Sequence, residues 1–304
     1  MGVELLGLSF TPIEIGDRMR LADLLARYPQ PLSDYTFASL LVWSPVYRYH
    51  HAIVESDTLL VSSMFGAERR PSLLQPVGRF PGTVQETLLR RARELPEPLR
   101  IESVSEEFLQ THPGFAAHFE VSSVRDSANY IYAAADLAGL RGRRYAGKRN
   151  LIAQASRLHP WSVEPLDPRR ADRCLGVADD IAARRTTEAA VTLEQETLAL
   201  ERALSLFAPL GLQGLLLRVA GHPAAFSIFD RLNPATAVVL FERARRTEKG
   251  LYQVINRETA RVIEGLGFSL INREEDLGDP GLRKAKLSYQ PTRLEMKYTL
   301  TFRA

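Results

Sequence analysis

Residues 127–158 constrain the fold more than any other part of the sequence. They begin with a short apolar segment, 129–133, whose two tyrosines are typical of a β-strand. Gly142 and Gly147 then interrupt any helical pattern. From Lys148 onward, apolar residues recur at helical spacing until a proline ends the helix. We therefore expect this stretch to be a joint between two halves of similar design.

The start of that helix carries an unusual concentration of positive charge. The N-terminus of a helix is itself partly positive, so an exposed cation there costs about 0.3–1 kcal/mol. Two kinds of compensating group are open: a carboxylate such as Asp136, or the phosphate of a bound ligand. In the second case we expect the basic residues to form an anion site together with Arg283 and Lys286. The positions concerned are Arg141, Arg143, Arg144, Lys148, Arg149 and Asn150.

The composition is that of an ordinary globular protein, and 304 residues suffice for one large or two ordinary domains. The formal net charge of +3 is small, so any anion site must come from local clustering of basic residues. The single cysteine, Cys174, excludes an intramolecular disulfide and fits a reducing compartment, and we expect a cytoplasmic protein. No apolar run reaches the roughly 18 residues of a membrane span. The N-terminus lacks the basic start of a secretion signal.

The predicted elements of the two halves follow one order. The first half runs as strand, helices, three strands, helix, strand, helix and two strands, and the segment 129–133 closes it. The second half repeats this order from Trp161, and its last strands are predicted at 268–271 and 294–302. The two halves share few letters, so the repeat is inferred from the pattern of elements.

The most specific stretch lies between the last two predicted strands, at 272–291. Its acidic triplet, 274–276, meets a basic group at 283–286 across a Gly-Asp-Pro-Gly turn. This stretch is similar, almost letter for letter, to the DUF2156 family, which is related to the C-terminal domain of phosphatidylglycerol lysyltransferase. The joint resembles the same family in the pattern Tyr130-x-Tyr132, Asp136-Leu137, Leu140-x-Gly142, Tyr145 and Lys148-Arg149-Asn150.

The resemblance implies two tandem GNAT-like folds, the fold of acetyltransferases. Together with the element order, it predicts an α/β chain of the mixed α+β type, in which each domain is a mixed sheet flanked by helices. We expect the first domain at 1–133, the joint at 134–147 and the second domain at 148–304. The active cleft is expected mainly in the second domain.

Two interpretations of residues 272–289 are open. In the structural one, the acidic and basic groups only pair to hold a loop, and exposed pairs of this kind contribute about 0–1 kcal/mol. In the functional one, the turn lines a cleft, a carboxylate acts as base or amine anchor, and the basic groups grip phosphate. Glycine would let the backbone approach a ligand closely. The catalytic candidates are Glu275, Asp276 and Tyr289, and the ligand-binding candidates are Asn272, Gly278, Arg283 and Lys286.

A second candidate stretch, 241–252, contains a strand end, a basic loop and a helix start. Backbone N–H groups at a helix N-terminus bind phosphate, and in a GNAT-like fold the pyrophosphate of acyl-CoA lies there. The usual loop contains more glycine than this one, which argues against ordinary acetyl-CoA use. Glu242, at the strand end, is either a general base or an ion-pair partner. The ligand-binding candidates are Arg246, Gly250 and Tyr252.

The resemblance implies an acyltransferase of the aminoacyl-transfer kind, in which an aminoacyl or acyl group passes to an amine or hydroxyl. The sequence contains no Gly-x-Ser-x-Gly elbow and no Walker loop, which fits direct attack without a covalent enzyme intermediate. Aminoacyl-tRNA and acyl-CoA are the two donors considered, so the expected partners are a phosphate-bearing substrate and tRNA.

No resident cofactor is expected. No metal site is expected either, because the three adjacent carboxylates lack a histidine or a spaced acidic partner. The sequence contains no feature that fixes an oligomeric state. The alternative function is that of a non-catalytic tandem module that binds an anionic ligand or a protein.

Overall fold

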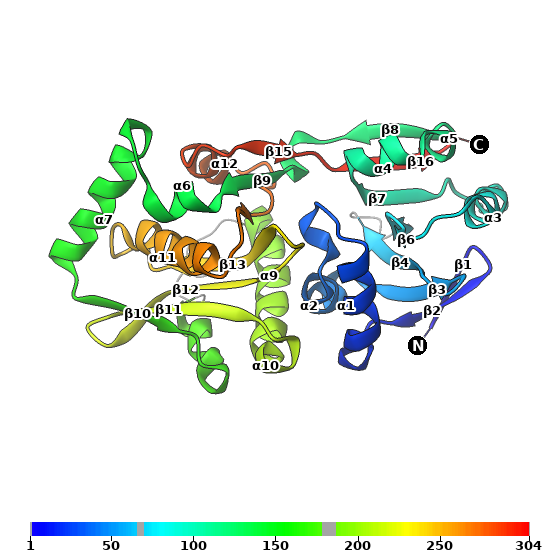
Figure 1. Ribbon diagram of the computed structural model, residues 1–304. Helices are drawn as coiled ribbons and strands as arrows, with labels where there is room; N and C mark the ends of the chain where they lie inside the picture. The colour runs from blue at the N-terminus through cyan, green and yellow to red at the C-terminus, as the bar shows by residue number, and fades with distance from the viewer. Residues whose placement is uncertain (1, 66–69, 178–186, 304) are drawn as a thin grey trace. The chain divides into compact units, whose positions relative to one another are not determined.

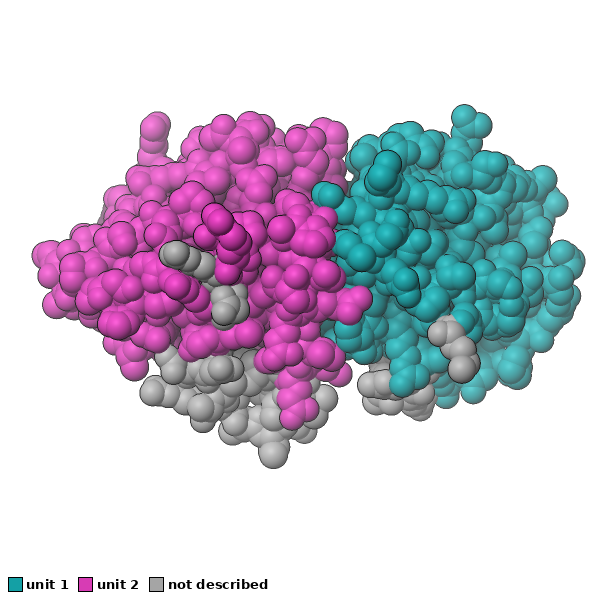
Figure 2. Space-filling model, turned by 90° about the horizontal axis from the view of Figure 1, so that it is seen from below, with its two compact units in different colours: residues 1–129, 275–278, 295–304 teal, residues 130–274, 279–294 magenta. Residues whose placement is uncertain are grey.

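The computed structural model describes residues 2–65, 70–177 and 187–303 (Figure 1). It divides into two compact units, which Figure 2 shows in different colours. Unit 1 consists of Met1–Asn129, Glu275–Gly278 and Glu295–Ala304, and unit 2 of Tyr130–Glu274 and Asp279–Leu294. None of the helices in the described ranges has both the length and the apolar character that a membrane span needs.

Unit 1 is built on a sheet that contains nine strands among the described residues. Its order is β1-β2-β3-β4-β5-β7-β16-β8, with β6 paired to β4, and the β5–β7 pair is parallel. The strands are β1 (Val3–Leu5), β2 (Leu8–Pro12), β3 (His50–Val54), β4 (Thr58–Phe65), β5 (Arg70–Leu74), β6 (Val77–Gly78), β7 (Arg100–Val104), β8 (Phe119–Ser123) and β16 (Tyr298–Phe302).

Helices flank this sheet, and aromatic side chains fill part of the core (Figure 1). The rings of Phe80 and Phe115 meet edge to face with centroids 5.0 Å apart, and Phe115 lies equally close to Phe119. Thr36 caps the helix that follows it by accepting a hydrogen bond from the Ser39 N–H. The helices are α1 (Arg18–Arg27), α2 (Phe37–Tyr47), α3 (Gly82–Ala92), α4 (Glu106–Thr111) and α5 (Pro113–Ala116), with short 3-10 turns at Ile15–Asp17, Ser33–Tyr35 and Arg125–Ser127.

Unit 2 is built on a second sheet, with seven strands in the described part of the chain. Its order is β10-β11-β12-β13-β14-β9-β15, and the β13–β14 pair is parallel. The strands are β9 (Asn129–Ala133), β10 (Trp161–Pro165), β11 (Gln213–Val219), β12 (His222–Arg231), β13 (Thr236–Ala244), β14 (Leu270–Asn272) and β15 (Arg293–Glu295).

Helix α11 (Leu251–Gly265) packs against β11, β12 and β13, and its apolar residues form the centre of the unit 2 core (Figure 1). Buried positions recur along it at helical spacing, which is why this amphipathic segment lies on the sheet. The other helices are α6 (Ala134–Gly139), α7 (Ala146–Leu158), α9 (Thr187–Ser205), α10 (Phe207–Leu210) and α12 (Pro280–Leu287), with 3-10 turns at Arg143–Tyr145 and Pro168–Cys174.

Two strands differ from their predicted places. Segment 129–133 was expected to close the first half, but β9 lies between β14 and β15 in the sheet of unit 2. Segment 294–302 was expected in the second half, but β16 lies between β7 and β8 in the sheet of unit 1. Burial explains both placements. Tyr130 and Tyr132 are fully buried in the core of unit 2, and Leu300 and Phe302 are buried in that of unit 1.

The fold class is confirmed, since both units are mixed α+β layers of a sheet and flanking helices. The helix predicted from Lys148 is also present, and it begins two residues earlier, at Ala146.

Candidate functional site

The candidate site begins where two parallel strands of unit 2 diverge. β13 pairs with β14 only over Thr236–Val238 and Leu270–Asn272, and β13 then continues to Ala244. Glu242 lies on this continuation, and Arg273 directly follows the end of β14. Arg273 Nη2 lies 2.7 Å from Glu242 Oε1, and the two side chains are only 13% and 8% exposed. A nearly buried ion pair therefore bridges the two diverging strands.

Neighbouring groups fix both members of this pair. Asn256 Nδ2, on α11, donates to Glu242 Oε2 at 3.2 Å, so both carboxylate oxygens accept a hydrogen bond. The guanidinium carbon of Arg273 lies 5.8 Å from the ring centroid of Tyr132 and 5.3 Å from that of Tyr289. Burial by itself lowers the pKa of Arg273, but Glu242, Tyr132 and Tyr289 together more than offset it, and the pKa is raised. The pair is therefore charged and held in one orientation.

Lys148, in the first turn of α7, approaches the same tyrosine. Its Nζ lies 3.9 Å from the ring centroid of Tyr289 and donates to Ser288 Oγ at 2.6 Å. Burial, with a smaller contribution from the charge of Arg273, lowers the pKa of Lys148 to about 8. Near neutral pH the amine is therefore able to lose its proton, as a general base must.

The tyrosines of the site are structural anchors. Tyr132 Oη donates to the Lys286 carbonyl at 2.9 Å, and Tyr145 Oη donates to the Tyr289 carbonyl at 3.1 Å. Burial raises the pKa values of Tyr132 and Tyr289, and the Tyr289 hydroxyl hydrogen-bonds the Gln253 side chain. Phenols with raised pKa values stay protonated at neutral pH, so the Tyr289 hydroxyl keeps its proton.

Lys286 also has an internal partner. It is buried, its Nζ donates to the Arg273 carbonyl at 2.6 Å, and the same atom lies 5.5 Å from the ring centroid of Tyr130. Asn272 is fully buried as well, and its Oδ1 accepts from the Glu274 N–H at 2.8 Å. Both side chains hold the turn that presents Arg273.

Three buried polar atoms on β12 and α11 have no hydrogen-bond partner among the described residues: Ser227 Oγ, Asn256 Oδ1 and Thr259 Oγ1. Ser227 is the direct partner of Glu242 across the β12–β13 ladder, so their side chains share one face of the sheet. Asn256 and Thr259 lie three residues apart on the buried side of α11. Unpaired buried polar atoms are uncommon, because each costs about 1–3 kcal/mol. Their gathering beside the ion pair marks this patch as one that a polar ligand group would satisfy.

The other two carboxylates predicted as catalytic belong to unit 1. Asp276 is fully buried, with Oδ2 3.0 Å from Arg125 Nη1 and Oδ1 accepting from the Gly278 N–H at 2.9 Å. Glu275 Oε1 contacts the Lys297 ammonium and accepts from Asn129 Nδ2 at 3.2 Å. These contacts are the ones expected if the two carboxylates hold the loop in place.

The basic residues of the joint have several kinds of partner. Arg149 Nη1 donates to the carbonyls of Leu140 and Gly142, at 2.5 and 2.7 Å, next to the C-terminal end of α6. Arg144 pairs with Asp136 at 2.7 Å, the carboxylate expected in one of the two alternatives. Of the remaining ligand-binding candidates, Asn150 and Arg246 are exposed and Arg283 is half-buried.

Gly250 has a structural role at the start of α11. Its φ is +95°, and a Cβ built there would lie 2.4 Å from the Leu151 carbonyl oxygen in α7. Glycine is required because α7 packs directly against the first turn of α11. Tyr252 is half-buried against the core of unit 2. Gly278, in unit 1, has a φ of +78° and lies close to the Asp126 carboxylate.

Sequence reasoning missed Arg273, Asn256 and Ser288 as members of the site. The available signals were a charged residue directly after a strand and a lone amide within the apolar spacing of a helix. Among the described residues, no group of three histidine, cysteine, aspartate or glutamate side chains is placed to hold a metal ion.

Comparisons with known proteins identify the family of the chain. The family described as phosphatidylglycerol lysyltransferase, C-terminal, matches residues 25–301. A conserved protein of unknown function from Bacteroides thetaiotaomicron is 30% identical, with a TM-score of 0.89, and the match covers 97% of this chain and 99% of that one. No curated protein matches the chain.

Two further solved structures are similar in fold. The C-terminal domain of a putative lysylphosphatidylglycerol synthetase from Agrobacterium fabrum is 15% identical, with a TM-score of 0.67 and coverage of 95% and 92% of the two chains. The lysylphosphatidylglycerol synthetase of Bacillus licheniformis is 14% identical, with a TM-score of 0.69 and coverage of 97% and 94%. The similarity extends over nearly the whole of each chain, so these proteins share one fold.

Proposed function

The chain belongs to the family of phosphatidylglycerol lysyltransferase C-terminal domains, and we propose that unit 2 transfers an aminoacyl group from an activated donor to an amine or hydroxyl. Aminoacyl-tRNA is the proposed donor. The observation that carries the proposal is the amine of Lys148, whose pKa is lowered to about 8 beside the Glu242–Arg273 pair.

Lys148 is proposed as the general base. In direct attack, the acceptor's nitrogen or oxygen forms a bond to the donor's carbonyl carbon and must lose a proton. A neutral Lys148 amine would take that proton, and the ester oxygen of the donor would leave with the electron pair of the broken bond. Ser288 Oγ, 2.6 Å from Nζ, keeps the amine in one place. General-base catalysis of this kind contributes about 10²–10⁴-fold in rate.

Arg273 is proposed to stabilise the negative charge that develops on the carbonyl oxygen. Its position is fixed by Glu242, so it needs no reorganisation during the reaction, which is the condition under which electrostatic catalysis is strongest. Because Glu242 is engaged by both Arg273 and Asn256, we assign it a positioning role.

The choice of an aminoacyl over a plain acyl donor is supported by the unpaired atoms beside Glu242. The amide oxygen of Asn256 can only accept, and the hydroxyls of Ser227 and Thr259 can donate or accept. An amino group satisfies such a set, whereas the methyl of an acetyl group leaves it unpaired.

The test is transfer of a radiolabelled aminoacyl group from aminoacyl-tRNA, with acetyl-CoA as the competing donor, to a panel of amine and hydroxyl acceptors. Lys148→Gln is expected to lower kcat by about 10²-fold or more. Lys284→Gln, which replaces an exposed lysine of α12, is the matched control and is expected to leave kcat unchanged. Tight binding of donor without turnover would contradict the proposal and favour a non-catalytic binding module.

A further inference from the structure

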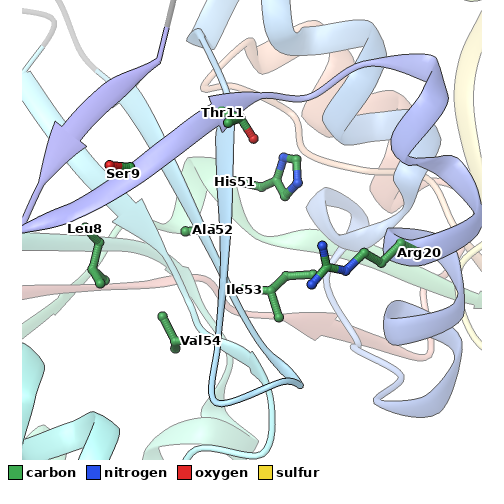
Figure 3. A pocket seen from close by; sticks show the side chains of 8 residues that line it. All are labelled: Leu8, Ser9, Thr11, Arg20, His51, Ala52, Ile53 and Val54. Atoms are coloured by element: carbon green, nitrogen blue, oxygen red, sulfur yellow. The ribbon is translucent and has the colours of Figure 1, made fainter.

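A pocket of about 250 Å³ lies in unit 1, where β2 turns away from β3 (Figure 3). β2 pairs with β3 only through Thr11 with His51 and Pro12 with His50, while residues 8–10 pair with β1. β3 pairs with β4 along its whole length. In the described part of the chain, residues 52–54 of β3 therefore have no strand partner on the β2 side, and they line the pocket.

One end of the pocket is basic. Arg20, from α1, reaches it beside His51 and Thr11 (Figure 3). Within the described ranges, the guanidinium of Arg20 forms no hydrogen bond and no ion pair. The nearby Asp17 is not part of the lining, and its Oδ2 accepts a hydrogen bond from the Glu14 N–H at 2.8 Å. Arg20 is therefore a cation that faces the pocket without a counterion.

His51 adds a second polar group to this end. Its side chain is only 9% exposed, and its Nδ1 has no hydrogen-bond partner. Burial lowers the pKa of His51, and the charges of Arg20 and His50 lower it further. Asp17, 3.9 Å from Nε2, and the backbone of Thr11 act in the opposite direction. The ring is therefore neutral at pH 7, and an anion in the pocket would draw a proton onto it.

The other walls are apolar. Leu8, Ile53 and Val54 line the pocket and are half-buried. The volume is smaller than that of the pockets that hold drug-sized molecules, which are about 300–1,000 Å³, so a smaller ligand fits.

We propose that this pocket binds a small amphiphilic anion, a phosphate or carboxylate joined to a short hydrocarbon chain. Arg20, His51 and Thr11 contact the anionic group, and Leu8 and Val54 contact the hydrocarbon. The pocket shares no residue with the candidate transferase site in unit 2, so its test does not depend on the proposed function.

The test follows the His51 ring by NMR, because the chain has only six histidines and their ring signals can be assigned by substitution. The full chain is titrated with butyl phosphate, butyrate and inorganic phosphate. We expect saturable shifts of the His51 signals, a rise in the His51 pKa on binding, and tighter binding of butyl phosphate than of inorganic phosphate.

Substitution separates this site from general attraction to a basic surface. Arg20→Gln is expected to weaken binding about tenfold or more, since a charge-assisted hydrogen bond is lost. Arg18→Gln removes an exposed arginine of the same helix that does not line the pocket, and it is expected to leave binding unchanged. Thr11→Val, with nearly the same shape, provides a second variant with weakened binding.

Several results would overturn the proposal. One is the absence of any His51 shift with all three probes. Another is an equal loss of affinity in the Arg18 and Arg20 variants, which would indicate non-specific binding. A third is equal affinity for butyl phosphate and inorganic phosphate, which would remove the role assigned to the apolar wall.

Discussion

At the scale of single residues, side chains of the same type have different roles because the fold gives them different surroundings. The acidic candidates Glu242, Glu275 and Asp276 are alike in type, but only Glu242 pairs with Arg273, the arginine whose charge helps to lower the pKa of Lys148. Asp276 is bound to Arg125 and to a backbone N–H, as a loop anchor is. Burial and partners, which depend on the fold, separate these roles.

The protonation of Lys148 gives the first prediction. If its neutral amine is the base, the transfer rate should rise as pH increases through about 8 and then level off. Lys148→Arg, which keeps the charge but cannot lose its proton, should abolish both the rate and this rise. A pH–rate profile checks this, and an unchanged profile in the variant would exclude Lys148 as the base.

The same residue predicts a pH dependence of stability. The pKa is lowered from 10.5 in the free side chain to about 8 in the folded protein, so the unfolded chain binds more protons between these values. The free energy of unfolding, relative to a Lys148→Met variant, should therefore rise as pH increases from about 8 toward 10.5. Urea denaturation of both proteins across this range measures it, and a flat or falling difference would contradict the assigned burial.

The Glu242–Arg273 pair gives a prediction about coupling. Glu242→Gln leaves a buried guanidinium without its counterion and should cost about 3–5 kcal/mol of unfolding free energy. The double variant Glu242→Gln, Arg273→Met should be less destabilised than the two single effects added together, because the orphaned charge is gone. Additive losses of unfolding free energy in a double-mutant cycle would mean that Glu242 and Arg273 do not stabilise each other.

At the scale of elements, α7 packs closely against α11 at Gly250. Its positive φ and the close Leu151 carbonyl leave no room for a side chain. The glycine expected to belong to a phosphate loop therefore serves helix packing, and the start of α11 is partly covered by α7. The divergence of β13 from β14 is the other feature at this scale, because β14 does not pair with β13 at Glu242 and Arg273 reaches that side chain instead.

Replacing Gly250 should test this packing. Gly250→Ala should lower the free energy of unfolding by at least about 1–3 kcal/mol, the usual cost of a strained backbone, with the clash in addition. Gly147→Ala, at an open position in the first turn of α7, should be neutral or slightly stabilising. Thermal or urea unfolding of the two variants compares them, and equal effects would show that contact with α7 is unimportant.

At the scale of the whole molecule, the two units are not consecutive in sequence. Residues 275–278 and 295–304 belong to unit 1, although unit 2 supplies most of the second half of the chain. β16 completes the sheet of unit 1 by filling the place between β7 and the edge strand β8, and β9 occupies the matching place between β14 and the edge strand β15 in unit 2. The sheet of unit 1 therefore depends on a strand from a distant part of the sequence.

Removal of residues 298–304 tests this dependence. Without β16, β7 and β8 lose their shared partner, so backbone amides of unit 1 should lose hydrogen-exchange protection by several orders of magnitude. Amides of β12 and α11 in unit 2 should keep most of theirs. Loss of protection centred on unit 2 would instead support the predicted division, in which residues 148–304 form one domain.

The sequence by itself determined the fold class, the family and most element positions, because hydrophobic periodicity and turn residues act locally. It also contained the charged residues of the candidate site, and it identified Lys148 and Glu242 among the candidates. Only the tertiary structure decided that β9 and β16 exchange sheets, that Arg273 bridges the diverging strands, and that Asp276 and Gly250 serve packing. These outcomes depend on burial and on contacts between residues far apart in the chain, and no local pattern records such contacts.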